Sequence, residues 1–447
     1  MGKNRFGNFF TSNINSIKKS QLKKNILSSN LVYAVNAIVI LVSYPIYLHY
    51  LGTELFGLWA TLSVVISFGE FGNLGISDAL IKLTAEEYGK NDKNGIAEYF
   101  TYASIILFVT SVILILTLIL LREEIIYFLN IDNTLHNLTF ILIPIVGIIS
   151  SSMFYVASLR GITMGAGRMD LANYIFLGNN VIKILLSIIL LVFDYGIWSI
   201  VLSIIATNIL SIVLYTIIIK RNLLLLLFTR VSVKDKKLKR LFGFSSNLVG
   251  MKLIDMLTLP FIKIIITRYL GLTELAYFEI AWKAAYNIRG FFEKGLLAIM
   301  PRVSELFART DKDKTLIRDL HNKGIKYVLY LGIPFIVIVY FFTQDLFQLW
   351  LQNNYNDTIK TVFHILLIGW GFSLIIVPAY YVLMGMGKVY LCLWESVLKS
   401  GINIIGLIIL INLGALTLYT LSFNITFAII ISHLFILYNY LKHYRLN

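Results

Sequence analysis

The sequence has 447 residues, of which 58% are hydrophobic and 14% are charged, and its mean hydropathy is +0.78. Soluble domains carry roughly 25% charged residues, so this chain has too little polar surface to cover a water-soluble core, which excludes an ordinary soluble protein. The net charge of +15 does not indicate nucleic-acid binding, because the basic residues form short clusters between apolar runs without a nucleic-acid fold signature. Cys392 is the only cysteine, which excludes an intrachain disulfide and a zinc site built from cysteines.

The N-terminal segment is polar and carries lysines, and it lacks the apolar stretch of a cleavable signal peptide. We therefore expect a cytoplasmic tail at 1–25, followed by apolar runs near the roughly 20 residues that a membrane span needs. The first six predicted spans are 26–48, 55–80, 99–121, 136–159, 170–193 and 197–219. The second six are 243–266, 275–300, 326–343, 359–383, 389–411 and 415–440. They predict an N-lobe at 26–222 and a C-lobe at 243–447, joined by a basic cytoplasmic linker at 223–242.

The distribution of basic residues predicts the orientation in the membrane. Of the 39 Lys and Arg residues, seven fall within predicted spans, and the loops on one side carry only Arg122, Arg268 and Lys360. All others lie on the opposite side, and cytoplasmic segments are the ones that collect positive charge. Both termini are therefore predicted to be cytoplasmic. The loops are too short for a folded extramembrane domain.

An internal repeat relates the two halves. Tyr-Leu-Gly at 50–52 recurs at 269–271, and a Met-Gly-x-Gly-basic motif at 164–168 recurs at 384–388. Motifs along the whole half keep an offset of 217 to 220 residues, which chance matches would not do. Because each half has an even number of spans, both copies have the same orientation, which is a parallel repeat. The sequence thus predicts an all-α polytopic membrane protein with about twelve transmembrane helices in two six-helix lobes.

The two lobes, the short repeat and the Gly-x-Gly-basic turn between the fourth and fifth spans of each lobe resemble the polysaccharide-biosynthesis flippases. These include the O-antigen and capsule flippases of the multidrug/oligosaccharidyl-lipid/polysaccharide exporter superfamily. The resemblance extends from about Leu22 to Tyr440. Lipid II flippases are similar, but they carry extra spans, so a chain of 447 residues favours the polysaccharide branch.

The resemblance implies a flippase that moves polyprenyl-pyrophosphate-linked oligosaccharide, an O-antigen or capsule-type repeat unit. Transport from the inner to the outer leaflet of the bacterial cytoplasmic membrane would use alternating access and no enzymatic step. The implied partners are this lipid-linked substrate, membrane lipid and other polysaccharide-assembly proteins, with no nucleic acid. No cofactor or metal is expected.

Basic residues within spans must face a wet cavity, pair with an acid or snorkel to the interface, because each costs about 2.5–3.5 kcal/mol at the centre of a lipid-facing span. They are Lys183, Lys252, Lys263, Lys283, Arg289, Lys294 and Lys399. Lys263 and Lys294 lie near predicted span ends, where their side chains are expected to snorkel to the interface.

The mid-membrane cations are concentrated in the second half, as Lys252, Arg289 and Lys399, with Lys183 in the first half. Lys and Arg pair strongly with phosphate oxygens. We therefore predict that these four residues bind an anionic pyrophosphate-sugar headgroup.

A structural role is the alternative for the charged residues, because several acids lie one helical turn from a cation. The pairs are Glu279 with Lys283, Arg289 with Glu293, Glu395 with Lys399, and Lys252 with Asp255. Coupling to a proton or sodium gradient needs a buried acid, and the candidates are Glu70, Asp78, Asp255, Glu279 and Glu395. The histidines show no metal-ligand spacing, and His364 and His433, the two within spans, are expected to be packed and hydrogen-bonded.

Two other functions stay open from the sequence. A multidrug exporter of the same superfamily would share the fold, but organic cations favour an acidic aromatic cavity, whereas the residues within spans here are mainly basic. A membrane glycan polymerase or ligase also handles lipid-linked sugars. Such enzymes present a large outer loop, and the longest outside loop here, near 122–135, is short.

Overall fold

The structure is a computed structural model, and the residues that it describes are 32, 35, 38–39, 41–67, 70–73, 75–222, 228–231, 236–297, 299–307 and 314–445. Every regular element within these residues is a helix, which confirms the all-α fold class. The predicted tail at 1–25 lies outside the described residues.

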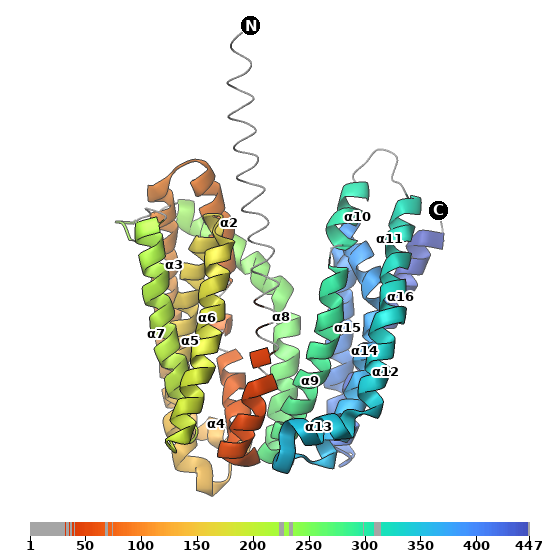
Figure 1. Cartoon of the computed structure of the whole chain (residues 1–447). Coiled ribbons are helices and arrows are strands. Elements are labelled where there is room, and N and C mark those ends of the chain that lie inside the picture. The colour runs from red at the N-terminus through yellow and green to blue at the C-terminus, as the bar shows by residue number, and fades with distance from the viewer. Residues whose placement is uncertain are drawn as a thin grey trace. The chain divides into compact units, whose positions relative to one another are not determined.

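The first half contains the helix Leu41–Ser67, η1 (Glu70–Asn73), α2 (Ile76–Gly89), α3 (Lys93–Leu120), α4 (Arg122–Leu129), α5 (Asn133–Gly165), α6 (Met169–Val192), α7 (Trp198–Ile217) and η2 (Ile218–Asn222). The second half contains α8 (Lys236–Leu270), α9 (Leu272–Leu296), α10 (Ile299–Phe307), α11 (Lys314–Tyr327), η3 (Val328–Gly332), α12 (Ile333–Phe341), α13 (Thr343–Leu351), η4 (Gln352–Asn354), α14 (Asp357–Gly385), α15 (Val389–Asn412) and α16 (Leu418–Arg445). Figure 1 shows these helices in chain order from red to blue.

Nine helices among the described residues are long and apolar enough to cross a membrane. They include α3, α5, α6, α7, α14 and α15, whose bounds differ from the predicted spans by a few residues. The helices α8 and α9 have 35 and 25 residues, which is also sufficient to cross a hydrocarbon core of roughly 30 Å. This architecture is that of a multi-pass membrane protein.

The second span of each half is interrupted, so the prediction of continuous helices at 55–80 and 275–300 is wrong. In the first half Gly75 has a φ of +67°, a left-handed conformation that ends helical geometry. In the second half α9 ends at Leu296 and α10 begins at Ile299. Pro301 falls in the first turn of α10, where its missing amide hydrogen costs no helical hydrogen bond.

The glycines of the repeat motifs have the same backbone role in both halves. Gly52 and its repeat equivalent Gly271 have φ values of +71° and +94°, and Gly271 separates α8 from α9. Gly167 and Gly387 have φ values of +81° and +77° and terminate α5 and α14. Left-handed backbone favours glycine because a Cβ atom would clash there, so the repeat preserves turn geometry.

The chain divides into two compact units. Unit 1 comprises the described residues of Met1–Ile46, Val65–Ile125 and Thr134–Gly250. Unit 2 comprises Tyr47–Val64, Ile126–Asn133 and the described residues of Met251–Asn447.

Unit 1 is a bundle in which α2 packs against α3 and α6 runs along α7 (Figure 1). Its core includes Leu80 and Leu83 of α2, Phe100 of α3 and Leu159 of α5, all buried. A Cβ at Gly165 would lie 2.6 Å from the carbonyl oxygen of Ile81 on α2. Glycine at this position therefore allows α5 and α2 to pack closely, and a larger residue at 165 would force them apart. The opposite face of α3 is apolar and exposed, as expected for a face in contact with lipid.

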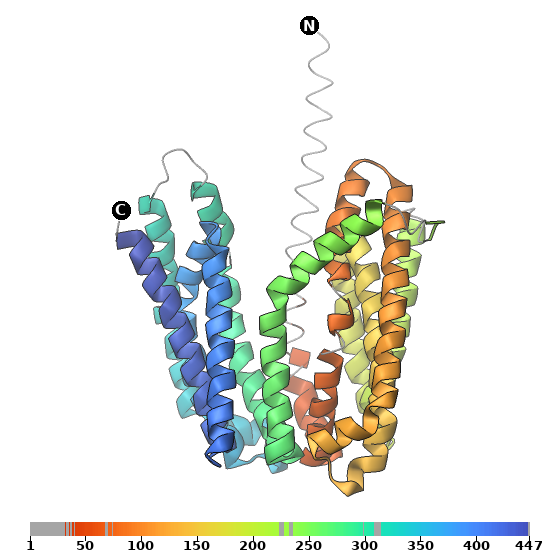
Figure 2. The same ribbon diagram turned by 180° about the vertical axis from the view of Figure 1, so that it is seen from behind.

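Unit 2 is organised around α14, which contacts α9, α10, α11 and α16. Its apolar stretch is 78% buried, against 39% for the corresponding stretch of α5. Seen from behind, the blue helices α15 and α16 lie side by side (Figure 2). Because α14 has neighbours on several sides, its polar side chains can point into the interior of the bundle. The candidate site lies in this unit.

Candidate functional site

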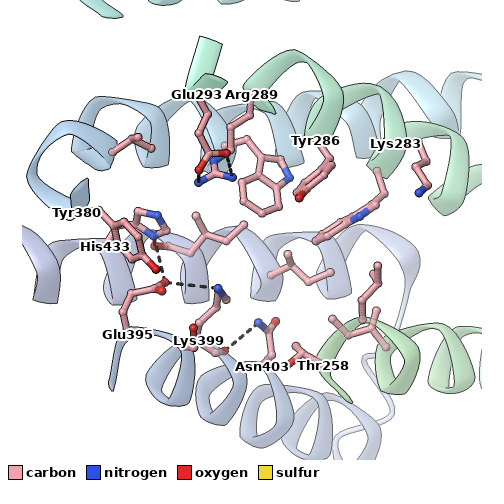
Figure 3. A pocket seen from close by; sticks show the side chains of 18 residues that line it. Thr258, Lys283, Tyr286, Arg289, Glu293, Tyr380, Glu395, Lys399, Asn403 and His433 are labelled. Carbon is pink, nitrogen blue, oxygen red and sulfur yellow. Dashed lines mark hydrogen bonds and ion pairs between the residues drawn. The ribbon is translucent and has the colours of Figure 1, made fainter. Parts of the chain in front are cut away.

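A cavity of about 500 Å³ lies within unit 2 and is lined by side chains of α8, α9, α14, α15 and α16 (Figure 3). Its polar lining comes mainly from two helices. On α9, Trp282, Tyr286, Arg289 and Glu293 follow one another at intervals of three or four residues and therefore share a face. On α15, Glu395, Lys399 and Asn403 are spaced four residues apart and also share one face of their helix.

Arg289 is held by contacts on three sides. Its Nη1 lies 2.9 Å from Oε2 of Glu293, and its Nε donates to Oγ of Ser373 at 3.1 Å. The guanidinium carbon lies 4.9 Å from the ring centre of Trp370, which is a cation–π distance. Tyr381 donates a further hydrogen bond to Glu293 at 3.2 Å. The charge of Arg289 is therefore paired and its side chain is fixed in position.

His433 continues this network from α14 to α16 and α15. Its Nδ1 lies 2.9 Å from the carbonyl oxygen of Ile429, which can only accept, so Nδ1 carries a hydrogen and donates. In the neutral ring Nε2 is then an acceptor, and it receives the hydroxyl hydrogen of Ser373 at 2.7 Å. The hydroxyl of Ser432 donates to Oε1 of Glu395 at 2.9 Å. The expectation that His433 is packed and hydrogen-bonded is confirmed.

The carboxylate of Glu395 lies close to both Lys399 and His433. Oε1 of Glu395 lies 3.6 Å from Nζ of Lys399 and 3.5 Å from Nδ1 of His433. Glu395 is 4% exposed, whereas the Lys399 side chain keeps 23% of its surface accessible. With a neutral imidazole, Lys399 is the cation that Glu395 neutralises. The predicted i,i+4 pairs of Arg289 with Glu293 and of Lys399 with Glu395 are both present.

The third predicted i,i+4 pair, Glu279 with Lys283, is wrong. Oε2 of Glu279 lies 2.8 Å from Nζ of Lys263, which comes from α8, and both side chains are buried. The expectation that Lys263 snorkels to the interface is also wrong, because Lys263 is only 8% exposed. An acid from the neighbouring helix lies within ion-pair distance, so the lysine pairs inside the protein.

Because Glu279 pairs with Lys263, Lys283 has no ion-pair partner among the described residues. Lys283 lines the cavity (Figure 3). The described charges of the cavity wall are Lys283, Arg289, Lys399, Glu293 and Glu395. Because the other two cations each have an acid, the net positive charge of the described wall resides on Lys283. Sequence reasoning assigned this lysine to Glu279 and missed it as a candidate.

An aromatic surface adjoins Lys283. The rings of Trp282 and Trp370 meet edge to face with centres 5.4 Å apart, and Tyr286 meets Trp370 in the same way at 5.6 Å. Two buried polar atoms of the wall have no hydrogen-bond partner within the described part of the chain, namely Nε1 of Trp370 and Oδ1 of Asn403. Buried polar atoms are normally satisfied, so an unpaired donor and an unpaired acceptor in a cavity wall indicate a polar ligand or water.

The remaining predicted residues lie elsewhere. Lys183 belongs to α6 of unit 1, where its Nζ donates to Oδ1 of Asn180 at 3.1 Å. Asp78 belongs to α2 of unit 1. The side chains of Lys252, Asp255 and Glu70 lie outside what the structure describes, although all three positions fall within helices. The structure therefore brings together Arg289 and Lys399 of the four predicted headgroup ligands, and adds Lys283.

Residues 49–360 match the protein family described as "Polysaccharide biosynthesis protein". This match covers most of the chain. The chain belongs to the polysaccharide biosynthesis protein family.

Solved structures of transporters share its fold. A multidrug resistance MATE family transporter of the MOP superfamily, in an inward-facing conformation, superposes with a TM-score of 0.72 at 14% identity over 93% of this chain and 94% of the other. The lipid II flippase MurJ, in an inward closed conformation, gives a TM-score of 0.69 at 16% identity over 93% and 87%. The Vibrio cholerae MATE transporter VcmN, in the bent form, gives 0.61 at 16% identity over 96% and 98%. At these identities the likeness shows the two-lobe transporter fold alone. No curated protein matches the sequence.

Proposed function

We propose that this protein is a flippase for a lipid-linked oligosaccharide, a polyprenyl-pyrophosphate-linked repeat unit of the O-antigen or capsule type. The observation that carries the proposal is the cavity of unit 2, in which an unpaired lysine lies beside an aromatic surface, in a chain of a polysaccharide-biosynthesis family. Such a cavity combines the two chemistries of the proposed headgroup, a negative phosphate and a sugar.

Lys283 is the proposed contact for a phosphate oxygen. Arg289 and Lys399 already have carboxylate partners, and an anion would have to displace these acids or share the cations with them. Lys283 requires no such exchange, so phosphate binding there costs less. A flexible lysine also offers three donors that can follow a moving headgroup.

Trp282, Tyr286 and Trp370 are the proposed contacts for the sugar. Aromatic faces pack against the apolar faces of sugar rings, while the unpaired Nε1 of Trp370 and Oδ1 of Asn403 provide a donor and an acceptor for hydroxyl groups. A site that satisfies both atoms would favour sugars with hydroxyls in matching positions.

Transport in this proposal is a rocking of the two lobes that exposes the headgroup site to one side of the membrane and then to the other. The lipid tail stays in the bilayer while the headgroup crosses. The positive-inside distribution of Lys and Arg supports cytoplasmic termini. The proposed substrate implies a location in the bacterial cytoplasmic membrane. The proposal needs no covalent chemistry.

Coupling to a proton or sodium gradient is part of the proposal. Glu279 is committed to Lys263, so it has a structural role. Of the candidate acids whose side chains the structure describes, Glu395 is the one that lines the cavity. We assign it the coupling role, because a change in its charge directly alters the charge balance of Lys399.

Export of glycan by cells that carry Lys283→Gln tests the site. We expect surface glycan to fall at least tenfold while the variant remains in the membrane at normal amount. Lys326→Gln is the matched control, because Lys326 is an exposed cation of the same unit outside the cavity wall. Normal export by Lys283→Gln would contradict the assignment of the phosphate contact.

A further inference from the structure

Arg160 of α5, in unit 1, is a cation without an acid partner among the described residues. Counting back from the repeat glycines Gly165 and Gly385, Arg160 is the equivalent of Tyr380. Tyr380 lines the cavity of unit 2. The internal repeat thus places a guanidinium in unit 1 where the other half has a side chain of its proposed substrate site.

The guanidinium of Arg160 is positioned but not neutralised. Its Nη2 lies 3.5 Å from Oδ1 of Asn173, and its carbon lies 4.5 Å from the ring centre of Phe176, both on α6. Its Nε is buried and has no hydrogen-bond partner in the described part of the chain. Arginine stays charged, so this guanidinium keeps its positive charge with one buried N–H unbonded within the described residues.

The acid one turn before Asn173 on α6 is already paired. Asp170 lies in the first turn of α6 and accepts two hydrogen bonds from Arg168, at 3.0 and 3.2 Å, in a bidentate pair. Arg160 is not part of that pair. An unpaired guanidinium inside an apolar helix is costly, and an anionic ligand with several oxygens would offset that cost.

Contacts with α6 fix the position of the guanidinium. Arg160 lies five residues before the end of α5. Its guanidinium contacts Asn173 and Phe176, four and seven residues inside α6, and its Nε is shielded from solvent. The side chain is held against the neighbouring helix.

The polar face of α6 extends from this point. Asn173, Phe176, Asn180 and Lys183 are spaced by three or four residues and share one face. Asn173 and Lys183 are ten residues apart, a rise of roughly 15 Å along the helix. Neither Arg160 nor Lys183 has an acid partner among the described residues, so the face is cationic at both ends.

We propose that Arg160 is a phosphate-binding residue of unit 1, which receives the phosphate of an isoprenoid-linked substrate with Asn173 as a neighbouring polar contact. The inference rests on the proposed function and deepens it, because it names a phosphate-binding residue in unit 1 for the same class of substrate. Phosphate oxygens fit the planar fork of the free guanidinium. Ordinary phospholipid phosphates share this chemistry, so the test must separate the two sources.

Binding of farnesyl pyrophosphate to the purified full-length protein in a neutral detergent tests the proposal. We expect Arg160→Gln to weaken binding roughly tenfold, the loss of about 1.4 kcal/mol that a charge-assisted hydrogen bond supplies. Arg160→Lys should keep part of the affinity, because it keeps the charge without the fork. Lys90→Gln is the matched control and should bind like the wild type, since the Lys90 side chain is 60% exposed and pairs with Glu87. Thermal unfolding of each variant verifies that it is folded.

The outcomes separate this inference from the proposed function. If the wild type binds and Lys283→Gln weakens binding but Arg160→Gln does not, the inference on Arg160 is overturned and the flippase proposal stands. If the wild type does not bind farnesyl pyrophosphate, both are overturned. If dioleoylphosphatidylglycerol displaces the probe at equal concentration from the wild type but not from Arg160→Gln, Arg160 is a general phospholipid contact and the substrate assignment fails.

Discussion

The ion pair between Lys263 of α8 and Glu279 of α9 allows a direct test of how unit 2 is held together. The two charged atoms are 2.8 Å apart, and the side chains keep only 10% and 8% of their surface accessible. Substitution of Glu279 by Gln removes one charge and leaves the ammonium of Lys263 buried without compensation. Helical spacing in the sequence pairs Glu279 with Lys283 instead. If the observed pair is correct, loss of the charge at 263 destabilises the protein, whereas the sequence-based pair predicts that loss of the charge at 283 does so.

At 2.8 Å, Coulomb attraction amounts to about 6 kcal/mol with an effective dielectric constant of roughly 20, before desolvation is subtracted. Removal of one partner from a buried pair costs about 3–5 kcal/mol, because the other charge is left in a medium of low polarity. We therefore expect Glu279→Gln to be strongly destabilising. Lys263→Met with Glu279→Leu should recover most of the loss, since it removes both charges at similar volume.

Thermal unfolding in detergent, followed by intrinsic fluorescence, measures these effects in a double-mutant cycle. The expected coupling between positions 263 and 279 is at least 2 kcal/mol, with none between 279 and 283. Lys283→Met is the control and should unfold near the wild-type temperature. A coupling of 279 with 283 instead of 263, or a wild-type melting temperature for Glu279→Gln, would refute the reasoning.

Three further predictions concern packing, charge and orientation. Gly385→Ala should destabilise the protein by about 1–3 kcal/mol, because its Cβ would lie 2.7 Å from the carbonyl oxygen of Met300. Gly178→Ala, whose Cβ meets nothing within 4 Å, should be neutral or stabilising in the same thermal assay. Glu395→Gln should strengthen farnesyl pyrophosphate binding roughly threefold, since Lys399 loses its neutralising acid; weaker binding would contradict the charge balance described for the cavity. An alkaline phosphatase reporter should be active when fused at position 132 and inactive at position 230, and the reverse pattern would overturn the orientation.

The sequence predicted much of the architecture because membrane spans and repeats leave strong local signals. Apolar runs located α3, α5, α6, α7, α14 and α15 to within six residues. The repeated Met-Gly-x-Gly motif coincides with helix ends where Gly167 and Gly387 have left-handed backbones. The interruption of the second span in each half was missed. A left-handed residue such as Gly75 marks the break in the structure.

The sequence predicted those contacts of the unit 2 cavity that lie within a single helix. Helical spacing found the pairs Arg289–Glu293 and Lys399–Glu395, because both partners lie on one helix. It could not detect that Lys263 on α8 competes with Lys283 for Glu279, since contacts between helices leave no fixed spacing in the sequence. The cavity lysine was missed for this reason.

Arg160 was missed because the predicted end of its membrane span was placed too early. The predicted span ended at 159, which assigned the residue to a cytoplasmic segment, whereas α5 continues to Gly165. An error of six residues at a helix end therefore concealed a cation within an apolar helix. The exact ends of helices depend on capping and on neighbours, which hydropathy does not record.

The most direct test of the account is the leaflet distribution of lipid-linked oligosaccharide in cells depleted of this protein. The repeat units are modified in intact cells by a membrane-impermeant, sugar-specific reagent and then extracted. We predict that complete repeat units accumulate and are protected from the reagent, and that re-expression of the wild type, but not of Lys283→Gln, restores their exposure. Full exposure of the repeat units in depleted cells would contradict the flippase account.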